Sequence, residues 1–281
     1  MLDLPLFFYL NRPMNMQKLT LYLLFFFSGA TSLVYESLWI RTLSLGVGST
    51  SASMSMVLSI FFFGLSAGSF IGGKLAKKIK KPIFYYGLME GLSGIFALLI
   101  LYPILNFQSI LSYLPLEDSF SLTFTIIKFA FVFILLILPT LCMGATLPLL
   151  IEICTHREKE YGRSISFLYA LNTFGAVFGA FMTSFALIPS FGIVDSYIYT
   201  VVISVLVLIV SKVLQEKSNL YSNSEIAAPT ADKVSFSNLN IQNKRLLLTI
   251  SGVVGFSAIT AQVVWNKYLG IYFGTNIFGL G

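Results

Sequence analysis

Five polar or charged residues of this sequence lie inside long apolar runs, where they could bind a cation or pair with one another. They are Glu36, Arg41, Glu90, Lys128 and Asn172. An ionised side chain at the centre of a lipid bilayer costs roughly 2.5 to 3.5 kcal/mol or more unless it is paired or hydrated. The sequence therefore marks these five residues as candidates for contact with a substrate.

Two pairings among these residues follow from their depth in the membrane. Counting about 1.5 Å per helical residue, Glu36 and Lys128 fall at similar depth near the outer side. We expect them to form an ion pair, which either fixes helix register or acts as a gated cation site, with Arg41 nearby at the outer surface. Glu90 and Asn172 both fall about one-third of the way up from the cytoplasm. A hydrogen bond between them and a water-filled cavity around Glu90 are the two alternatives there.

Composition indicates the solvent in which these residues lie. The chain has 281 residues, of which 56% are hydrophobic and 11% are charged, and its mean hydropathy is +0.84. Several apolar runs exceed the roughly 20 residues that a helix needs to cross about 30 Å of hydrocarbon. The sequence therefore predicts an all-α polytopic membrane protein with the lipid bilayer as its main partner. The net charge of +6 is a topology signal and gives no reason to expect a nucleic-acid partner.

The apolar runs divide the chain into four parts. Residues 1–18 are expected to form a cytoplasmic N-terminal segment, 19–214 a domain of six transmembrane helices, 215–245 a cytoplasmic linker, and 246–281 a seventh transmembrane helix that starts a second repeat. The six helices are predicted near residues 19–40, 52–73, 83–105, 122–150, 165–188 and 193–214. Most Lys and Arg residues fall on one side of this arrangement, so the positive-inside rule places the N-terminus in the cytoplasm.

Two internal repeats organise these helices. The stretch from Gly255 aligns with the stretch from Gly29 at a constant shift of 226, which pairs Trp39 with Trp265. An even number of helices separates these copies, so they have the same orientation in the membrane. The stretch "FGLSAGSF" at residues 63–70 also resembles "FGAVFGAF" at residues 174–181. That match predicts inverted three-helix repeats within the first six helices.

Small residues and one proline are predicted to shape the helix contacts. Glycines recur every four residues at Gly64, Gly68 and Gly72, and again at Gly175 and Gly179. Such a stripe lets another backbone approach closely, although it could also line a passage. Pro139 removes a backbone hydrogen bond inside the fourth helix and predicts a kink, which is either a hinge or a simple bend.

Metal and enzyme sites are not expected from the residue pattern. Cys142 and Cys154 are too far apart for a zinc motif, and His156 is the single histidine. The sequence has no Gly-rich loop after a strand and no Ser/His/Asp set. We therefore predict no catalytic residue, no metal and no cofactor in this chain.

Five stretches carry a family resemblance when they are taken together in this order. They are "SGATSLVYESLWIRTLSLGVGST", "GLSAGSFIGGKLAKKIKKP", "YGLMEGLSGIFAL", "LPTLCMGATLPLL" and "YGRSISFLYALNTFGAVFGAFMTSFALIPSFG". These stretches resemble the membrane portion of bacterial fused transporter-like/spermidine synthase proteins over nearly the whole chain. The positions that fit the family's membrane motifs are Glu36, Trp39, Arg41, Glu90, Pro139, Gly144 and Asn172.

The resemblance implies a six-helix major-facilitator-like half plus the start of a second half, located in the bacterial inner membrane as a multi-pass protein. It also implies a following cytoplasmic aminopropyltransferase-like domain, and we expect the chain to be truncated before that domain. No catalytic residue is therefore carried over to this sequence.

Three functional hypotheses follow. The first is a membrane domain that recognises or transports an organic cation such as a polyamine. The second is a membrane anchor for a C-terminal aminopropyltransferase domain. The third is a truncated half-fold that has no function alone or gains one by forming a homodimer.

Overall fold

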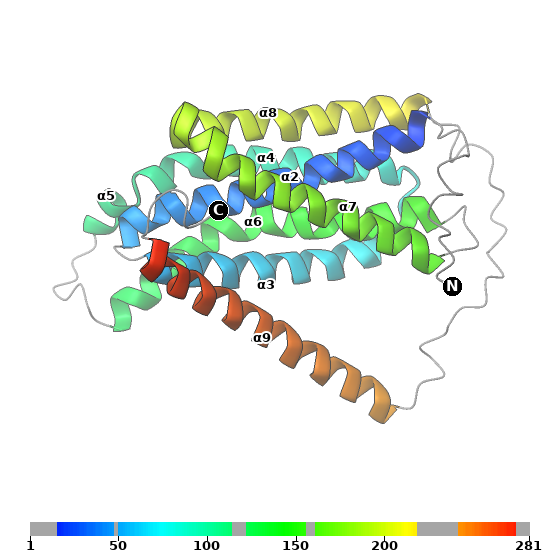
Figure 1. The fold of residues 1–281 in the computed structure, drawn as a ribbon. Coiled ribbons are helices and arrows are strands. Elements are labelled where there is room, and N and C mark those ends of the chain that lie inside the picture. Colours follow the sequence, from blue (N-terminus) through cyan, green and yellow to red (C-terminus); the bar gives the residue numbers. More distant parts are fainter. Residues whose placement is uncertain (1–15, 48–49, 114–121, 156–160, 218–240, 274–281) are drawn as a thin grey trace.

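The computed structural model describes residues 16–47, 50–113, 122–155, 161–217 and 241–273, and these residues form helices without any strand (Figure 1). The elements are α2 (Met16–Val47), α3 (Thr50–Ala76), α4 (Pro82–Leu105), α5 (Phe107–Ser112), α6 (Leu122–Thr155), α7 (Tyr161–Met182), the π-helical turn η1 (Thr183–Leu187), α8 (Ile188–Lys217) and α9 (Ile241–Phe273). The prediction of an all-α protein is confirmed for this part of the chain. Helices are expected here, because a backbone in hydrocarbon must satisfy its hydrogen bonds within its own segment.

Six helical segments are long and apolar enough to cross a membrane. They are Leu19–Val47, Ser51–Ala76, Pro82–Leu105, Leu122–Ile153, Ser166–Lys217 and Arg245–Trp265. The fifth segment has 52 residues, more than twice the roughly 20 that one crossing needs. It bends at Gly192, where φ is +76° and the backbone is not helical. The bend falls between the predicted fifth and sixth helices and separates them into two rods (Figure 1).

Several helices are longer than predicted. α2 continues to Val47, α8 continues to Lys217, and α9 begins at Ile241, so α8 and α9 both enter the predicted linker 215–245. Hydropathy locates only the part of a helix that lies in hydrocarbon, and α8 and α9 add mostly polar turns beyond it. Residues 1–15 of the predicted N-terminal segment, 218–240 of the linker and 274–281 of the second repeat lie outside the described residues.

The first six spans pack as three principal pairs. α2 packs most extensively against α7, α3 against α6, and α4 against α8. This pattern is unchanged when the first three spans (α2, α3, α4) are exchanged for the last three (α6, α7, α8). Inverted three-helix repeats would produce such an arrangement.

The glycine stripes lie inside these helix pairs. A Cβ atom at Gly64 or Gly68 would overlap atoms of α6, and one at Gly175 or Gly179 would overlap backbone carbonyl groups of α2. Gly72 faces Ala145, and Gly144 faces the backbone of Leu65. The two stripes therefore serve close helix packing, and neither lines a passage. Pro139 lies inside α6, which continues as one helix to Thr155.

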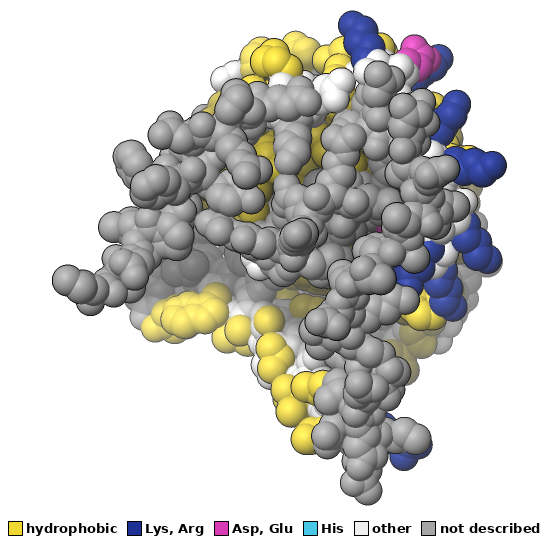
Figure 2. Space-filling model, turned by 90° about the vertical axis from the view of Figure 1, so that its right-hand side faces the viewer, with side chains coloured by type: hydrophobic (Ala, Val, Ile, Leu, Met, Phe, Trp, Pro, Cys, Tyr) yellow, Lys and Arg dark blue, Asp and Glu magenta, His cyan; other side chains and the backbone are white. Residues whose placement is uncertain are grey.

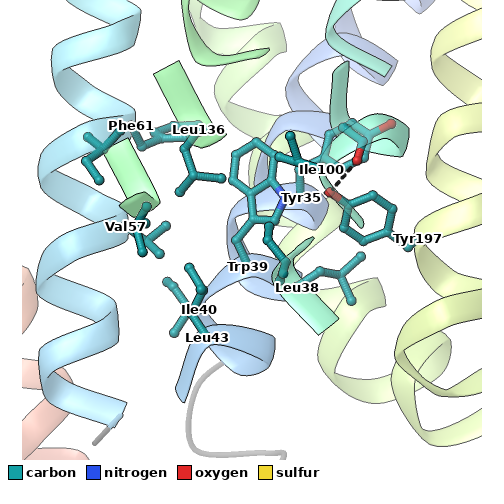
Figure 3. Packing of buried hydrophobic residues seen from close by; sticks show 14 of the residues in the cluster. Tyr35, Leu38, Trp39, Ile40, Leu43, Val57, Phe61, Ile100, Leu136 and Tyr197 are labelled. Carbon is teal, nitrogen blue, oxygen red and sulfur yellow. Dashed lines mark hydrogen bonds between the residues drawn. The ribbon is translucent and has the colours of Figure 1, made fainter. Parts of the chain in front are cut away.

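Apolar side chains form two clusters along the bundle. The cluster around Trp39 brings together α2, α3, α4, α6 and α8 (Figure 3). A second cluster lies nearer the opposite end and includes Phe25, Ile83, Tyr86 and Leu150. These two clusters hold the rotation and the depth of α2, which carries Glu36 and Arg41.

The last helix, α9, diverges from the bundle and approaches α3 at one end (Figure 1). Its side chains are mostly exposed, and a Cβ atom at Gly255 would meet no other atom within 4 Å. Gly29, the equivalent residue of α2, is packed against α7. The repeat in the sequence is therefore not matched by equivalent packing of the two helices.

Candidate functional site

Glu90 is the most deeply buried acidic residue among the described residues. Its side chain is 1% exposed, and its carboxyl oxygen Oε1 accepts a hydrogen bond from the Ser28 hydroxyl of α2. One turn earlier on α4, the Tyr86 hydroxyl donates to the backbone carbonyl of Leu24 over 3.0 Å. Glu90 thus belongs to a set of hydrogen bonds between α2 and α4, and no Lys or Arg among the described residues forms an ion pair with it.

A second polar connection lies further along α2 and joins three helices. The indole Nε1 of Trp39 donates to the Tyr197 hydroxyl of α8 over 2.7 Å, and that hydroxyl donates to the Ala97 carbonyl of α4 over 3.0 Å. Tyr35 stacks on Trp39 with 5.7 Å between ring centroids and meets Tyr197 edge-on (Figure 3). The Tyr35 hydroxyl lies 3.3 Å from the Ser204 hydroxyl. These contacts fix the rotation of α2 relative to α4 and α8.

Glu36 differs from Glu90 because its carboxyl has no partner. The side chain is 5% exposed, yet it makes no hydrogen bond and no ion pair with any described residue. Among the described residues, the side-chain oxygen atoms that have neither exposed surface nor a hydrogen-bond partner belong to Ser184 and Ser211. The carboxyl oxygens of Glu36 are not among them, although they have no partner. Both Glu36 carboxyl oxygens therefore keep some accessible area. The site offers a hydrogen-bond acceptor that is largely shielded from solvent but can still be reached.

The expected ion pair between Glu36 and Lys128 is not formed. The Lys128 ammonium lies 4.4 Å from the centroid of the Phe124 ring, one turn earlier on α6. Such a position gives the ammonium a favourable cation–π contact without any carboxylate. α6 packs mainly on α3 and α4, whereas α2 packs mainly on α7, so the two residues lie on helices that are not principal neighbours. Arg41, also on α2, is partly buried.

The expected hydrogen bond between Glu90 and Asn172 is also not formed. α2 lies between them: Ser28 bonds to Glu90 on one side, while the next residue, Gly29, packs on Asn172 of α7. A Cβ atom at Gly29 would overlap the Asn172 carbonyl and lie 2.9 Å from its Oδ1 atom. The Asn172 side chain is partly buried and makes no hydrogen bond with a described residue.

Glu36 and Asn172 lie on the same side of α2. Residues seven apart project from one face of a helix, so Glu36 lies on the face of Gly29, which packs on Asn172. Seven residues correspond to about 10 Å along the helix. Glu36 of α2, with its unbonded carboxyl, therefore lies about 10 Å along α2 from the place where Gly29 meets Asn172 of α7.

The two tryptophans predicted to be equivalent lie in different surroundings. Trp39 is fully buried, whereas Trp265 on α9 is 59% exposed and contacts the Tyr268 ring edge-on at 6.2 Å. The aligned residues also differ in polarity, since Gln262 stands opposite Glu36 and Val254 opposite Ser28. The acidic residue Glu36 is therefore not repeated in α9.

Sequence reasoning missed the uncharged members of this site, which are Ser28, Tyr35, Tyr86, Tyr197 and Ser204. Ser and Tyr residues are frequent in this chain, so a search for charged residues in apolar segments does not single out these five. A signal was present, because Ser28, Tyr35 and Trp39 are seven and four residues apart and share one face of α2. The triplet Gly-Ala-Thr also occurs at residues 29–31 of α2 and again at 144–146 of α6.

Metal binding finds no support in the described residues, which contain no group of three or more His, Cys, Asp or Glu side chains able to hold an ion. His156 lies outside them. The site instead offers the Glu36 carboxyl as a hydrogen-bond acceptor near the buried rings of Tyr35 and Trp39. Such a site can receive a ligand that carries positive charge and N–H donors.

Comparison with protein-family models, curated protein sequences and solved structures found no match to this chain.

Proposed function

We propose that the bundle α2–α8 is a membrane domain that recognises an organic cation, and that the carboxyl of Glu36 binds its positive charge. The observation that carries the proposal is the state of Glu36: it is buried inside an apolar span, unbonded and still accessible. An acidic residue inside a membrane segment is retained at an energetic cost, and it usually marks a path or a site for a charged ligand.

The ligand class follows from the second acceptor on the same side of α2. The unbonded Asn172 amide of α7 lies beside Gly29, and Glu36 lies seven residues, or about 10 Å, further along α2. An elongated cation with N–H donors at both ends, such as a polyamine, can satisfy both groups. A compact inorganic cation would reach one of them. The resemblance to fused transporter-like/spermidine synthase proteins points to the same ligand class.

Glu90 has a different role in this proposal. Its hydrogen bond from Ser28 and its complete burial tie α4 to α2 beside the site. In this proposal Glu90 holds α2 in place through Ser28, and Glu36 makes the contact with the ligand. The bacterial inner membrane, with the Lys-rich end of the bundle in the cytoplasm, is the location that we propose for the domain.

The test uses the two tryptophans as site-specific reporters. In the full chain carrying Trp265→Phe, the single remaining indole is Trp39, which lies three residues from Glu36. Titration with spermidine should change its fluorescence in a saturable way, and choline should have a much weaker effect. In the matched variant Trp39→Phe, the remaining Trp265 should give no saturable response, because it lies on α9 outside the site.

The deciding variant is Glu36→Gln in the Trp265→Phe background. A charge-assisted hydrogen bond contributes about 1.5 to 3 kcal/mol, so the dissociation constant should rise about 10- to 150-fold. Glutamine has nearly the same size and shape as glutamate, so this substitution removes the charge and leaves the packing little changed. Equal spermidine affinity in both proteins would refute the role of Glu36. A folded protein that binds no spermidine at all would favour the two other hypotheses, a membrane anchor for a synthase domain or an inactive half-fold.

A further inference from the structure

The turn between α3 and α4 concentrates positive charge at one end of the bundle. Residues 74–81, here named the basic turn, contain five lysines: Lys74, Lys77, Lys78, Lys80 and Lys81. All five side chains are exposed, and none forms an ion pair with a described residue. Figure 2 shows Lys and Arg side chains gathered along one edge of this end of the molecule. Nothing in the described part of the protein neutralises this charge.

The basic turn has a defined shape. The backbone amides of Lys78 and Ile79 donate to carbonyl groups of the last turn of α3, and the amide of Tyr85 donates to the carbonyl of Lys81. Ile79 packs against the apolar cluster that includes Ala76 and Ile83. Because this one apolar residue points inward, the lysines on either side of it point outward. The backbone of the turn is therefore held in place, and the lysine side chains project outward from it.

Neighbouring helix ends extend the basic surface. The amide of Phe84 donates to the Gln215 side chain, and the Gln17 side chain donates to the carbonyl of Lys217. These hydrogen bonds hold the start of α4, the end of α8 and the start of α2 together. They add the exposed Lys212 and Lys217 to the same end of the bundle, where Glu216 is an exposed acidic residue.

The depth of the basic turn matches the polar surface of a bilayer. Lys74 lies in the last turn of Ser51–Ala76, an apolar segment long enough to cross the membrane, and the other four lysines lie between this segment and the next one, which begins at Pro82. The Lys74 ammonium lies 3.9 Å from the centroid of the Phe70 ring, so its aliphatic chain runs along α3 at the end of the apolar span. Lysines at this level meet lipid headgroups, and they attract the anionic ones.

We propose that the basic turn is a binding surface for anionic phospholipid headgroups, which this protein prefers over zwitterionic ones. The occupant is a lipid phosphate in the leaflet that faces this end of the bundle. Charge complementarity, the fixed turn and its level at the end of two apolar spans lead to this assignment. It is independent of cation recognition at Glu36, which lies in the interior of α2.

The experiment measures thermal stability of the detergent-solubilised full chain during titration with phosphatidylglycerol or phosphatidylcholine. Phosphatidylglycerol should raise the melting temperature at a lower lipid concentration than phosphatidylcholine. Each lysine near an anionic surface should contribute about fivefold to that preference. The variant with Lys77, Lys78, Lys80 and Lys81 all changed to Gln should lose most of the preference, whereas the same four changed to Arg should keep it.

Controls separate the basic turn from charge in general and from free phosphate. Lys128→Gln with Lys267→Gln removes two positive charges outside the basic turn and should leave the preference intact. Inorganic phosphate at the same phosphate concentration should not reproduce the effect of phosphatidylglycerol. If the Gln variant does not fold, the wild-type protein still decides, because 0.5 M salt should abolish the preference by screening.

Three results would overturn the proposal. The first is equal stabilisation of the wild-type protein by both lipids. The second is a preference for phosphatidylglycerol that survives in the Gln variant, or in the wild-type protein at high salt. The third is full replacement of the lipid effect by inorganic phosphate, which would identify a site for free anions.

Discussion

The hydroxyl group of Tyr197 joins three helices, and its removal gives a sharp test of the packing around Trp39. Tyr197→Phe deletes one oxygen atom that accepts the hydrogen bond of the Trp39 indole and donates to the Ala97 carbonyl. All of these groups are buried. Phenylalanine fits the same space, so the substitution changes hydrogen bonding with little change in packing volume.

The expected loss of stability is dominated by the indole N–H. Without Tyr197 Oη this donor is left buried and unbonded, which costs about 1 to 3 kcal/mol. The Ala97 carbonyl loses less, because it lies inside α4 and keeps its place in the helix. Hydrogen bonds within membrane proteins average about 0.6 kcal/mol when measured by double-mutant cycles, which sets the lower end of the expectation. We therefore expect Tyr197→Phe to lower the free energy of unfolding by about 0.6 to 2 kcal/mol.

The assay is unfolding of the Trp265→Phe protein in mixed micelles with increasing denaturing detergent, followed by Trp39 fluorescence. Tyr199→Phe is the matched control, since Tyr199 lies two residues away, is 46% exposed and packs edge-to-face with Phe191. Its hydroxyl can be lost with an effect below about 0.5 kcal/mol. Equal stability of the two variants would show that the Tyr197 hydroxyl does not join α2, α4 and α8 as described.

Two further substitutions test the backbone geometry of the fold. Gly179→Leu should prevent close packing of α2 on α7 and reduce the folded fraction severely, because a Cβ atom there would overlap the Ala30 carbonyl. Gly252→Leu should be tolerated, because nothing lies within 4 Å of its Cβ position. Equal trypsin resistance of both variants would contradict this packing. Gly192→Ala should destabilise the protein by about 1 to 3 kcal/mol in the same detergent unfolding assay, because φ is +76° there and a residue with a side chain is strained at that angle. The Cβ atom itself has room, since nothing lies within 4 Å of its position. An unchanged unfolding midpoint would contradict the bend at Gly192.

The sequence was sufficient to predict the helices, because the requirement for about 20 apolar residues per crossing leaves a strong signal in composition. It also predicted the close-packed faces, since glycines four residues apart at Gly64 and Gly68 leave few alternatives to helix contact. Helix ends were less predictable. The extra turn of α8 is polar, and the extra turns of α2 mix polar and apolar residues, so hydropathy does not distinguish them from a loop.

The pairings of polar side chains could not be predicted from depth alone. Depth placed Glu90 level with Asn172, and the structure places α2 between them, so that Ser28 and Gly29 each take one of the two contacts. Similar depth also suggested a pair between Glu36 and Lys128, although their helices are not principal neighbours. Which helices are neighbours depends on the packing of the whole bundle, and one sequence without structure does not specify that.

The bend at Gly192 has a consequence for how the protein enters the membrane. A single glycine lies between the helical rods of the fifth and sixth spans, so almost no chain must cross the bilayer apart from the helices themselves. Two helices joined in this way can enter the lipid together as a hairpin, with their backbone hydrogen bonds already formed. Biogenesis of this part of the protein then requires translocation of a turn, whereas a long polar loop would have to be carried across the membrane on its own.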